Sequence, residues 1–195
     1  MNITERIKRI LLTPKEEWPR IAAEAASIQS LYVPYIVVLA AIGPLAMLIS
    51  FAVLGLGIGV GAAVFAYLHA LIGVAILALI VDGLAPSFGG TRDYVRALKL
   101  VAYSFTALWV AQIALLIPVA GAVIALIGLV YSLYLFFLGA PVLGKTAPEK
   151  ALPFTIVVVI CAIVAMYLLG LIARSLGLGF GVPGPIAIGP TGLPR

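Results

Sequence analysis

Charged residues divide this chain into long apolar runs. No Asp, Glu, Lys or Arg occurs from Leu31 to Val81, from Leu100 to Gly144, or from Ala151 to Ala173. As one helix, the first run would extend about 75 Å at roughly 1.5 Å per residue, whereas the hydrocarbon core of a bilayer is about 30 Å thick. The first two runs must therefore fold back once each, while the third fits a single span.

Glycine and proline positions predict where the runs reverse. Glycine density peaks at Gly55, Gly57, Gly59 and Gly61 in the first run, and Pro118 with Gly121 breaks the second. The apolar and polar residues do not alternate as they would in a barrel. We therefore expect an all-α polytopic membrane protein, with five transmembrane helices in one bundle over residues 32–54, 60–82, 98–117, 120–140 and 152–173.

Composition supports a membrane location. Hydrophobic residues make up 64% and charged residues 10% of the chain, against roughly 45–50% and about 25% in soluble domains. The single cysteine, Cys161, can form no intrachain disulfide. The net charge of +5 favours contact with anionic lipid head groups over nucleic acid, because the charges flank the predicted spans.

Basic residues fall mostly on one side of the five predicted spans. One side receives Arg6, Lys8, Arg9, Lys15, Arg20, Arg92, Arg96, Lys99, Lys145 and Lys150, and the other only Arg174 and Arg195. Cytoplasmic loops carry the excess of Lys and Arg. The N-terminus is therefore predicted in the cytoplasm and the C-terminus outside.

The segment 1–30 is expected to form short amphipathic helices. Glu5 and Arg9 can pair at i,i+4, and Thr13 is a candidate cap for a second helix beginning at Pro14. Pro19 is expected to interrupt that helix near Trp18. Two alternatives remain: the helices lie at the membrane interface with Trp18 among the head groups, or they pack on the bundle itself.

Between the second and third spans lies a basic loop. Pro86 and Gly89 with Gly90 are expected to end span two, and Thr91 to cap the next helix. Arg92, Arg96 and Lys99 then have the spacing i, i+4 and i+7, which predicts that they share one face of the helix that enters span three. With three N-terminal residues this face would form a cytoplasmic surface for anionic lipid or an acidic partner, made of Arg6, Lys8, Arg9, Arg92, Arg96 and Lys99. The alternative is that these residues only set the topology.

Strong polarity within the spans is limited to His69 and Gln112. We interpret His69 as a structural hydrogen-bonding residue with Gln112 as a candidate partner. Asp82 is expected to pair with the loop cations. Tyr131, Tyr134, Phe136 and Phe137 are expected to form an interfacial aromatic cluster.

Enzyme motifs are missing from the sequence. It contains no HExxH, no GxSxG and no Cys/His cluster. The segment "GAPVLGKT" (Gly139–Thr146) has the GxxxxGK[ST] spacing, but it follows a predicted transmembrane span, whereas a phosphate-binding loop of this kind joins a strand to a helix. We therefore predict no catalytic residues, no metal site and no cofactor. The segment 175–195 is a Gly/Pro-rich tail without helical periodicity.

Four segments together resemble the Yip1 family, especially its short prokaryotic branch, from about Ile10 to about Leu171. They are "LLTPKEEWPRIAAE", "ALKLVAYS", "YSLYLFFLGAPVL" and "KTAPEKAL". Eukaryotic members carry a DLYGP motif before the first span, and "SLYVP" here matches it at Leu31, Tyr32 and Pro34 but not at Ser30 and Val33. The other positions that carry the resemblance are Tyr103, Tyr131, Tyr134 and Pro141.

The resemblance implies five spans, a location in a prokaryotic cytoplasmic membrane, and a non-catalytic role. Eukaryotic members are implicated in membrane traffic, bind prenylated Rab-type GTPases and bind one another, but their long N-terminal region has no counterpart in these residues. We therefore expect a membrane organiser or adaptor that acts through self-association, lipid or partner binding at its cytoplasmic face. The alternative is a small channel or transporter with a polar path near His69 and Gln112, although transporters usually bring more polar groups to the midplane.

Overall fold

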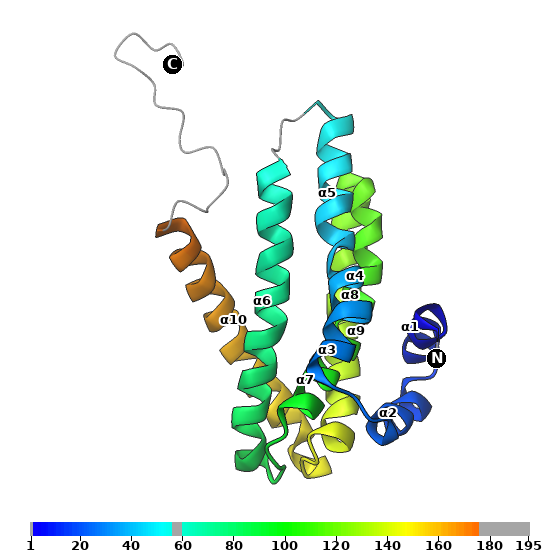
Figure 1. Cartoon of the computed structure of the whole chain (residues 1–195), viewed down its shortest axis with the longest axis vertical. Coiled ribbons are helices and arrows are strands. Elements are labelled where there is room, and N and C mark those ends of the chain that lie inside the picture. Colours follow the sequence, from blue (N-terminus) through cyan, green and yellow to red (C-terminus); the bar gives the residue numbers. More distant parts are fainter. Residues whose placement is uncertain (1, 56–59, 176–195) are drawn as a thin grey trace.

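The chain forms a bundle of five long apolar helices, with short helices beside one end of it. The structure, a computed structural model, describes residues 2–55 and 60–175, which are helices and short connections (Figure 1). Five segments are long and apolar enough to cross a membrane: Ile28–Val53, Val60–Phe88, Tyr94–Leu116, Val119–Leu143 and Pro148–Ser175. Each overlaps one predicted span. The expected all-α, five-span architecture is confirmed.

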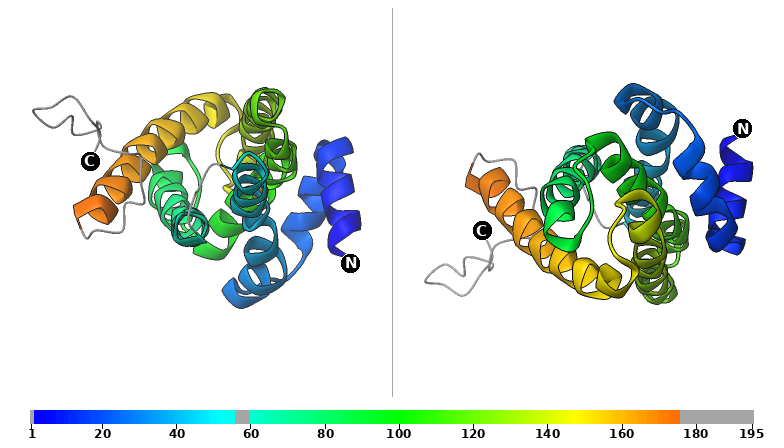
Figure 2. Two further views of the ribbon diagram at one scale, coloured as in Figure 1. Left: turned by 90° about the horizontal axis from the view of Figure 1, so that it is seen from above. Right: turned by 90° about the horizontal axis from the view of Figure 1, so that it is seen from below.

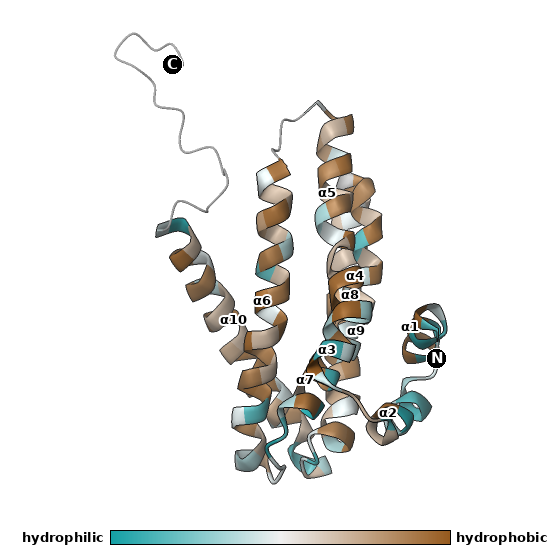
Figure 3. Ribbon diagram, viewed as in Figure 1, coloured by the Kyte–Doolittle hydropathy of each residue, from teal (hydrophilic) through white to brown (hydrophobic). Residues whose placement is uncertain are grey.

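Hydrophilic residues are most frequent at the end of the bundle where the N-terminal helices and the loops 85–93 and 144–150 lie, which we call the loop end (Figure 3). The opposite end holds the turn between the first two spans and the last described residue, Ser175. Between the two ends the helices consist mostly of hydrophobic residues, many of them exposed, as lipid contact requires (Figure 3).

Span one is a helix with two irregularities. It consists of α3 (Ile28–Leu31), the π-helical turn η1 (Tyr32–Ile36), α4 (Val37–Ala40) and α5 (Ile42–Val53). Pro34 lies within η1, where the wider turn accommodates a ring that has no N–H and would crowd the preceding carbonyl.

Tyrosine hydroxyls bind span one to span two, which is α6 (Val60–Leu84). Tyr67 of α6 donates to the Val37 carbonyl at 2.9 Å, one turn before the interruption at Ala41. Tyr32 donates in the other direction, to the Leu71 carbonyl at 3.2 Å. The turn between these spans begins at Gly55, whose φ of +67° favours glycine; the predicted turn residues Gly57 and Gly59 lie outside the described residues.

Span three is the centre of the bundle. It consists of α7 (Tyr94–Ser104), α8 (Thr106–Ala111) and the 3-10 turn η3 (Gln112–Leu116). In its most apolar stretch 56% of the residues are buried inside the protein, whereas in that of the last span 11% are. Where α7 and α8 meet, the Leu108 N–H donates to the Ser132 hydroxyl of span four at 2.9 Å. The Tyr35 and Thr106 hydroxyls bond at 2.6 Å, so span one also supports this interruption.

Span four is α9 (Pro118–Leu143), and it begins at the proline predicted to reverse the chain. Two glycines let it lie close to span three. A Cβ on Gly121 would stand 2.0 Å from the Ala114 carbonyl oxygen, and a Cβ on Gly128 would stand 2.3 Å from the Ala111 Cβ. Small residues permit such close helix approach, so this hairpin is tightly packed.

Span five is attached mainly at its start. After the short turn η4 (Pro148–Lys150), α10 (Ala151–Ser175) begins with Phe154, which stacks on Phe136 at 6.0 Å between ring centroids. From there α10 diverges from α6 and the rest of the bundle (Figures 1 and 2). The predicted tail lies beyond Ser175, outside the described residues.

The N-terminal helices α1 (Ile3–Leu12) and α2 (Pro14–Ala23) pack on the side of the bundle (Figure 2). Trp18 is 1% exposed and lies against Gly139 of α9, where a Cβ would be 2.8 Å from its ring. Of the two alternatives for segment 1–30, the structure shows packing on the bundle. Trp18 is therefore not an outward-facing interfacial residue.

Three predictions about helix ends were wrong. Thr13 stands at the N-cap position of α2, but its side chain makes no capping hydrogen bond. Pro19 does not interrupt α2, because it is exposed and removes only the hydrogen bond to the carbonyl of Lys15, which is exposed as well. Thr91 does not cap α7; the N-cap is Asp93, whose carboxylate accepts from the Arg96 N–H at 3.1 Å. A carboxylate is favoured there by the helix dipole. Arg92 consequently precedes the helix. Gly89, with φ of +84°, ends span two as predicted.

The contact between Trp18 and Gly139 predicts the effect of a single methyl group. Gly139→Ala should lower the thermal unfolding temperature of the purified protein, since overpacking costs about 1–3 kcal/mol and the new Cβ would also meet Leu100 at 2.6 Å. Gly170→Ala is the matched control in α10, because no atom of the described residues lies within 4 Å of the position of its Cβ. It should leave stability unchanged or raise it slightly. Equal effects of the two substitutions would contradict the packing described here.

Candidate functional site

The six basic residues predicted to form one cytoplasmic surface divide into two groups. Lys8 and Arg92 are exposed, and Arg9 and Arg96 are partly exposed beside the carboxylates of Glu5 and Asp93. Arg6 and Lys99 are buried, at 6% and 5% exposure. The predicted basic face of Arg92, Arg96 and Lys99 therefore does not form, because Arg92 lies before α7 and Lys99 points into the protein.

Arg6 is the centre of a buried ion cluster. Its guanidinium donates to Glu17 at 2.5 Å and to both carboxylate oxygens of Glu24. Glu17 is fully buried, whereas the Glu24 side chain is 49% exposed. The guanidinium also lies 5.5 Å above the centroid of the Tyr103 ring, a cation–π distance.

Electrostatics hold the Arg6 charge in place. Burial by itself lowers the pKa of Arg6, but the hydrogen bond to Glu24 and the nearby carboxylates outweigh it and raise the pKa above its ordinary value. Arg20 adds a second, longer ion pair to Glu17 at 3.6 Å. Removing one member of such a buried group would leave an uncompensated charge.

Lys99 binds the end of α2. Its ammonium group donates to the Ile21 carbonyl at 2.8 Å and to the Glu24 carbonyl. Carbonyls at a helix C-terminus lack partners within the helix and carry partial negative charge. Lys99 therefore joins α2 to span three, over 70 residues away in sequence.

A polar cavity of about 270 Å³ lies beside this cluster, between α1, span one and span three. Its polar lining comes from Arg6, Glu24, Lys99, Tyr35, Tyr103 and Ser30. Leu31 and Pro34, which match the family motif, line it as well. The two cations of this cavity are already bound to acids and carbonyls, so the cluster holds the N-terminal helices on the bundle.

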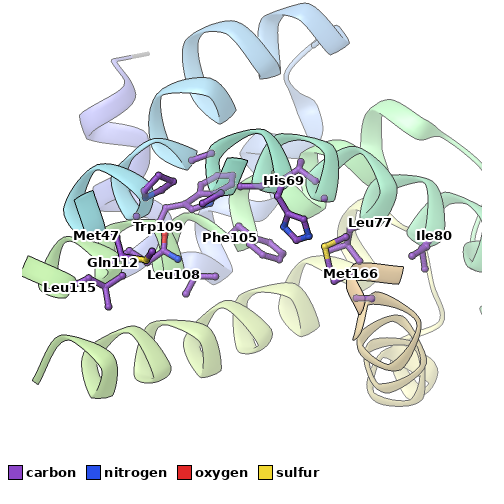
Figure 4. Close-up of a pocket in the computed structure, with 18 residues that line it drawn as sticks. Met47, His69, Leu77, Ile80, Phe105, Leu108, Trp109, Gln112, Leu115 and Met166 are labelled. Carbon is purple, nitrogen blue, oxygen red and sulfur yellow. The ribbon is translucent and has the colours of Figure 1, made fainter. Parts of the chain in front are cut away.

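A second cavity, of about 280 Å³, brings His69 and Gln112 into one place inside the bundle (Figure 4). His69 comes from α6 and Gln112 from η3. Figure 4 shows Gln112 beside Met47 and Leu115, with His69 further along the cavity. Among the described residues, no hydrogen bond joins the two side chains or satisfies either. The predicted direct partnership is therefore not formed, although both side chains line the same space.

Asp82 does not form the predicted ion pair with Arg92, Arg96 or Lys99. Arg96 pairs with Asp93 at 3.1 Å, and Lys99 is bound to carbonyls. One Asp82 carboxylate oxygen is buried without a hydrogen-bond partner in the described part of the chain.

The predicted aromatic cluster is split by the fold. Tyr131 and Tyr134 lie together, 5.6 Å between centroids, and the Tyr131 hydroxyl donates to the Leu11 carbonyl at 2.7 Å. Phe136 is buried and stacks on Phe154 instead. Consecutive residues of a helix face different directions. Tyr131 therefore contacts the N-terminal helices, whereas Phe136 packs against span five.

Several residues that organise the site could not be found from the sequence. Glu17 and Glu24 pair with Arg6 across 11 and 18 positions. The helical structure breaks between α1 and α2 at Thr13, and α2 ends before Glu24, so periodicity within one helix does not predict these pairs. Tyr35 and Ser132 could have been suspected, because hydroxyls within apolar runs usually bond to another span.

Comparison with known proteins identifies the family. A model of the Yip1 domain matches residues 8–171, and the chain belongs to the Yip1 family of membrane proteins. Members of this family are generally non-catalytic proteins of membrane traffic. No curated protein and no solved structure matches the chain. In the described residues, no group of three or more His, Cys, Asp or Glu side chains could hold a metal ion.

The buried cluster predicts a strong dependence of stability on Arg6. Arg6→Gln should destabilise the purified protein by roughly 3–5 kcal/mol, because Glu17 then stays buried without its main partner. Arg6→Gln combined with Glu17→Gln should recover most of that loss, as measured by thermal unfolding in detergent. Arg9→Gln removes the exposed pair with Glu5 and should cost at most about 0.5 kcal/mol. No recovery in the double variant would show that the two side chains do not act as a pair.

Proposed function

We propose that this chain is a non-catalytic membrane organiser or adaptor that acts through its cytoplasmic face. In this proposal the loop end of the bundle is cytoplasmic, and its exposed cations bind anionic lipid head groups or an acidic patch on a partner. Self-association of the chain in the membrane is a further part of the proposal. The expected location is a prokaryotic cytoplasmic membrane.

The observation that carries this proposal is the separation of buried from exposed cations. Arg6 joins α1 to α2 and lies over Tyr103 of span three, and Lys99 joins α2 to span three. Their binding leaves Lys8 on α1 and Arg92 before α7 at the surface, with Arg9 and Arg96 only partly engaged by local acids. The surface cations are therefore mounted on a fixed scaffold, so their arrangement needs little ordering when a ligand binds.

The magnitude fits peripheral lipid contact. Each Lys or Arg near an anionic membrane surface contributes about 1 kcal/mol, and this attraction weakens with salt. Four such residues give a modest, salt-sensitive preference for anionic lipid. That strength suits an organiser already held in the membrane by its spans.

A second candidate function is a small channel or transporter, and the observation that suggests it is the cavity with His69 and Gln112. Its remaining lining is almost wholly apolar, from Ala40 and Met47 to Ile80 and Met166. A polar path usually needs several polar groups and broken helices near the midplane. We therefore favour the organiser.

The lipid proposal predicts a loss of binding when exposed cations are removed. Lys8→Gln with Arg92→Gln should weaken binding of anionic lipid to the purified protein in detergent by up to about thirtyfold at low salt and less at high salt, because each cation contributes about 1 kcal/mol. Binding is compared with neutral lipid in each case.

Arg174→Gln is the matched control, because Arg174 is exposed at the opposite end, on α10. It should leave anionic-lipid binding unchanged. Unchanged binding in the Lys8 and Arg92 variant, or equal loss in the control, would reject this surface as the binding site. A specific loss of protein cross-linking without loss of lipid binding would instead assign it to a partner.

The orientation predicts different labelling of the two ends. In a Cys161→Ala background, Ser87→Cys and Ser175→Cys place single thiols on exposed residues at the loop end and at the end of α10. A membrane-impermeant maleimide added to intact cells should label Cys at 175 and not at 87. Permeabilised cells, in which both should react, provide the control. Labelling at 87 from outside would reverse the topology.

A further inference from the structure

The cavity that contains His69 and Gln112 is polar in one part and apolar in another. Its lining on α6 recurs every three or four residues along a single helix face, at positions Ala66, His69, Ala70, Gly73, Val74, Leu77 and Ile80. At roughly 1.5 Å per residue, this face extends about 20 Å along the bundle. His69 lies in its first half, and the second half, to Ile80, is apolar. The shape is that of an elongated slot with polar groups in one half.

Both polar side chains in the slot are without partners in the described part of the chain. In hydrocarbon an unpaired polar group is costly, and such residues usually face a ligand, a partner or a hydrated cavity. Gln112 is also closely fitted, since a Cβ on Gly43 would lie 2.3 Å from its amide oxygen. The glycine therefore lets the amide group of Gln112 lie at the wall of the slot.

The side of the slot facing span five is formed by a flexible residue. Met166 of α10 reaches Gly73, where a Cβ would lie 3.0 Å from its sulfur. A neighbouring apolar cavity of about 410 Å³, between α9 and α10, shares Leu77, Phe105 and Met166 with the slot. Methionine adapts its shape easily, and α10 diverges from the bundle beside it (Figure 1). A molecule could thus enter from the lipid phase past Met166.

We propose that this slot binds a single-chain neutral lipid. Its uncharged hydroxyl or carbonyl group bonds to His69 and Gln112, and its hydrocarbon chain follows α6 toward Leu77 and Ile80. The head group is uncharged because no Asp, Glu, Lys or Arg of the described residues lines the slot, and an ionic group buried there would need a counter-charge. The slot has room for one chain at most, because its volume of about 280 Å³ lies just below that of ordinary ligand pockets, roughly 300–1,000 Å³.

This binding site is independent of the cations at the loop end. It is tested with the full-length protein in nanodiscs and a monoacylglycerol that carries a photoreactive diazirine near the end of its chain. After irradiation, mass spectrometry should find the label on peptides containing Leu77, Ile80 or Met166. Unlabelled monoacylglycerol should compete for these sites.

Variants separate the slot from the general lipid surface. Ala66→Phe fills the slot and should reduce labelling at least tenfold. Ala75→Phe is the same change on α6 at a residue that lines neither cavity, and it should have no effect. His69→Leu and Gln112→Met keep similar volume but remove the polar groups, and each should weaken competition by unlabelled monoacylglycerol about tenfold. If the Ala66→Phe variant does not fold, the His69→Leu and Gln112→Met variants still test the proposal.

Three results would overturn the proposal. Labelling spread over the outer surface of the helices, insensitive to both Ala66→Phe and competition, would show that the slot holds no lipid. Equal labelling by a diazirine alkane that lacks a head group, in wild type and both polar variants, would reject the role of His69 and Gln112. Stronger competition by a lysophospholipid than by the monoacylglycerol would reject a neutral head group.

Discussion

The requirement that every backbone polar group in lipid be satisfied by the protein governs this fold. Its helices are interrupted at several places, and side chains from other spans bond there. The Tyr67 hydroxyl binds a carbonyl of span one, and the Ser132 hydroxyl accepts the Leu108 N–H at the break in span three. Tyr35 and Thr106 complete the same break. The interruptions thus fix how spans one to four pack, because each one needs a particular neighbour.

Buried charged groups at the loop end are likewise paired with partners from other segments of the protein. Arg6, Glu17 and Glu24 lie together, and Lys99 occupies the free carbonyls at the end of α2. Replacing such buried groups by apolar ones is often neutral for stability, so their value here is positional. They determine where α1 and α2 sit and therefore which cations stay at the surface. The cations outside this cluster, such as Lys8 and Arg92, form the surface that we propose binds lipid or a partner.

Span five does not share this tight packing. It is joined to the bundle through Phe154 at its start and is mostly exposed beyond that point. Three polar side chains in the two cavities along it have no hydrogen-bond partner among the described residues: His69 and Gln112 in one cavity and the buried Ser104 in the other. Unsatisfied polar groups beside a loosely packed helix are the feature expected of a site that takes up a molecule from the membrane.

The sequence by itself determined the class, the five spans and the turns at Gly89 and Pro118, because run length, charge position and helix-breaking residues act locally. It also showed that His69 and Gln112 were the polar residues at depth. The tertiary structure alone decided that Lys99 and Arg6 face inward, that Trp18 packs on Gly139, and that His69 and Gln112 line one cavity with no hydrogen bond between them. These outcomes depend on which helices are neighbours. From helical spacing alone, Arg6 and Lys99 are predicted to lie at the surface. Their burial depends on carboxylates and carbonyls that lie many positions away in the sequence and that only the fold brings beside them.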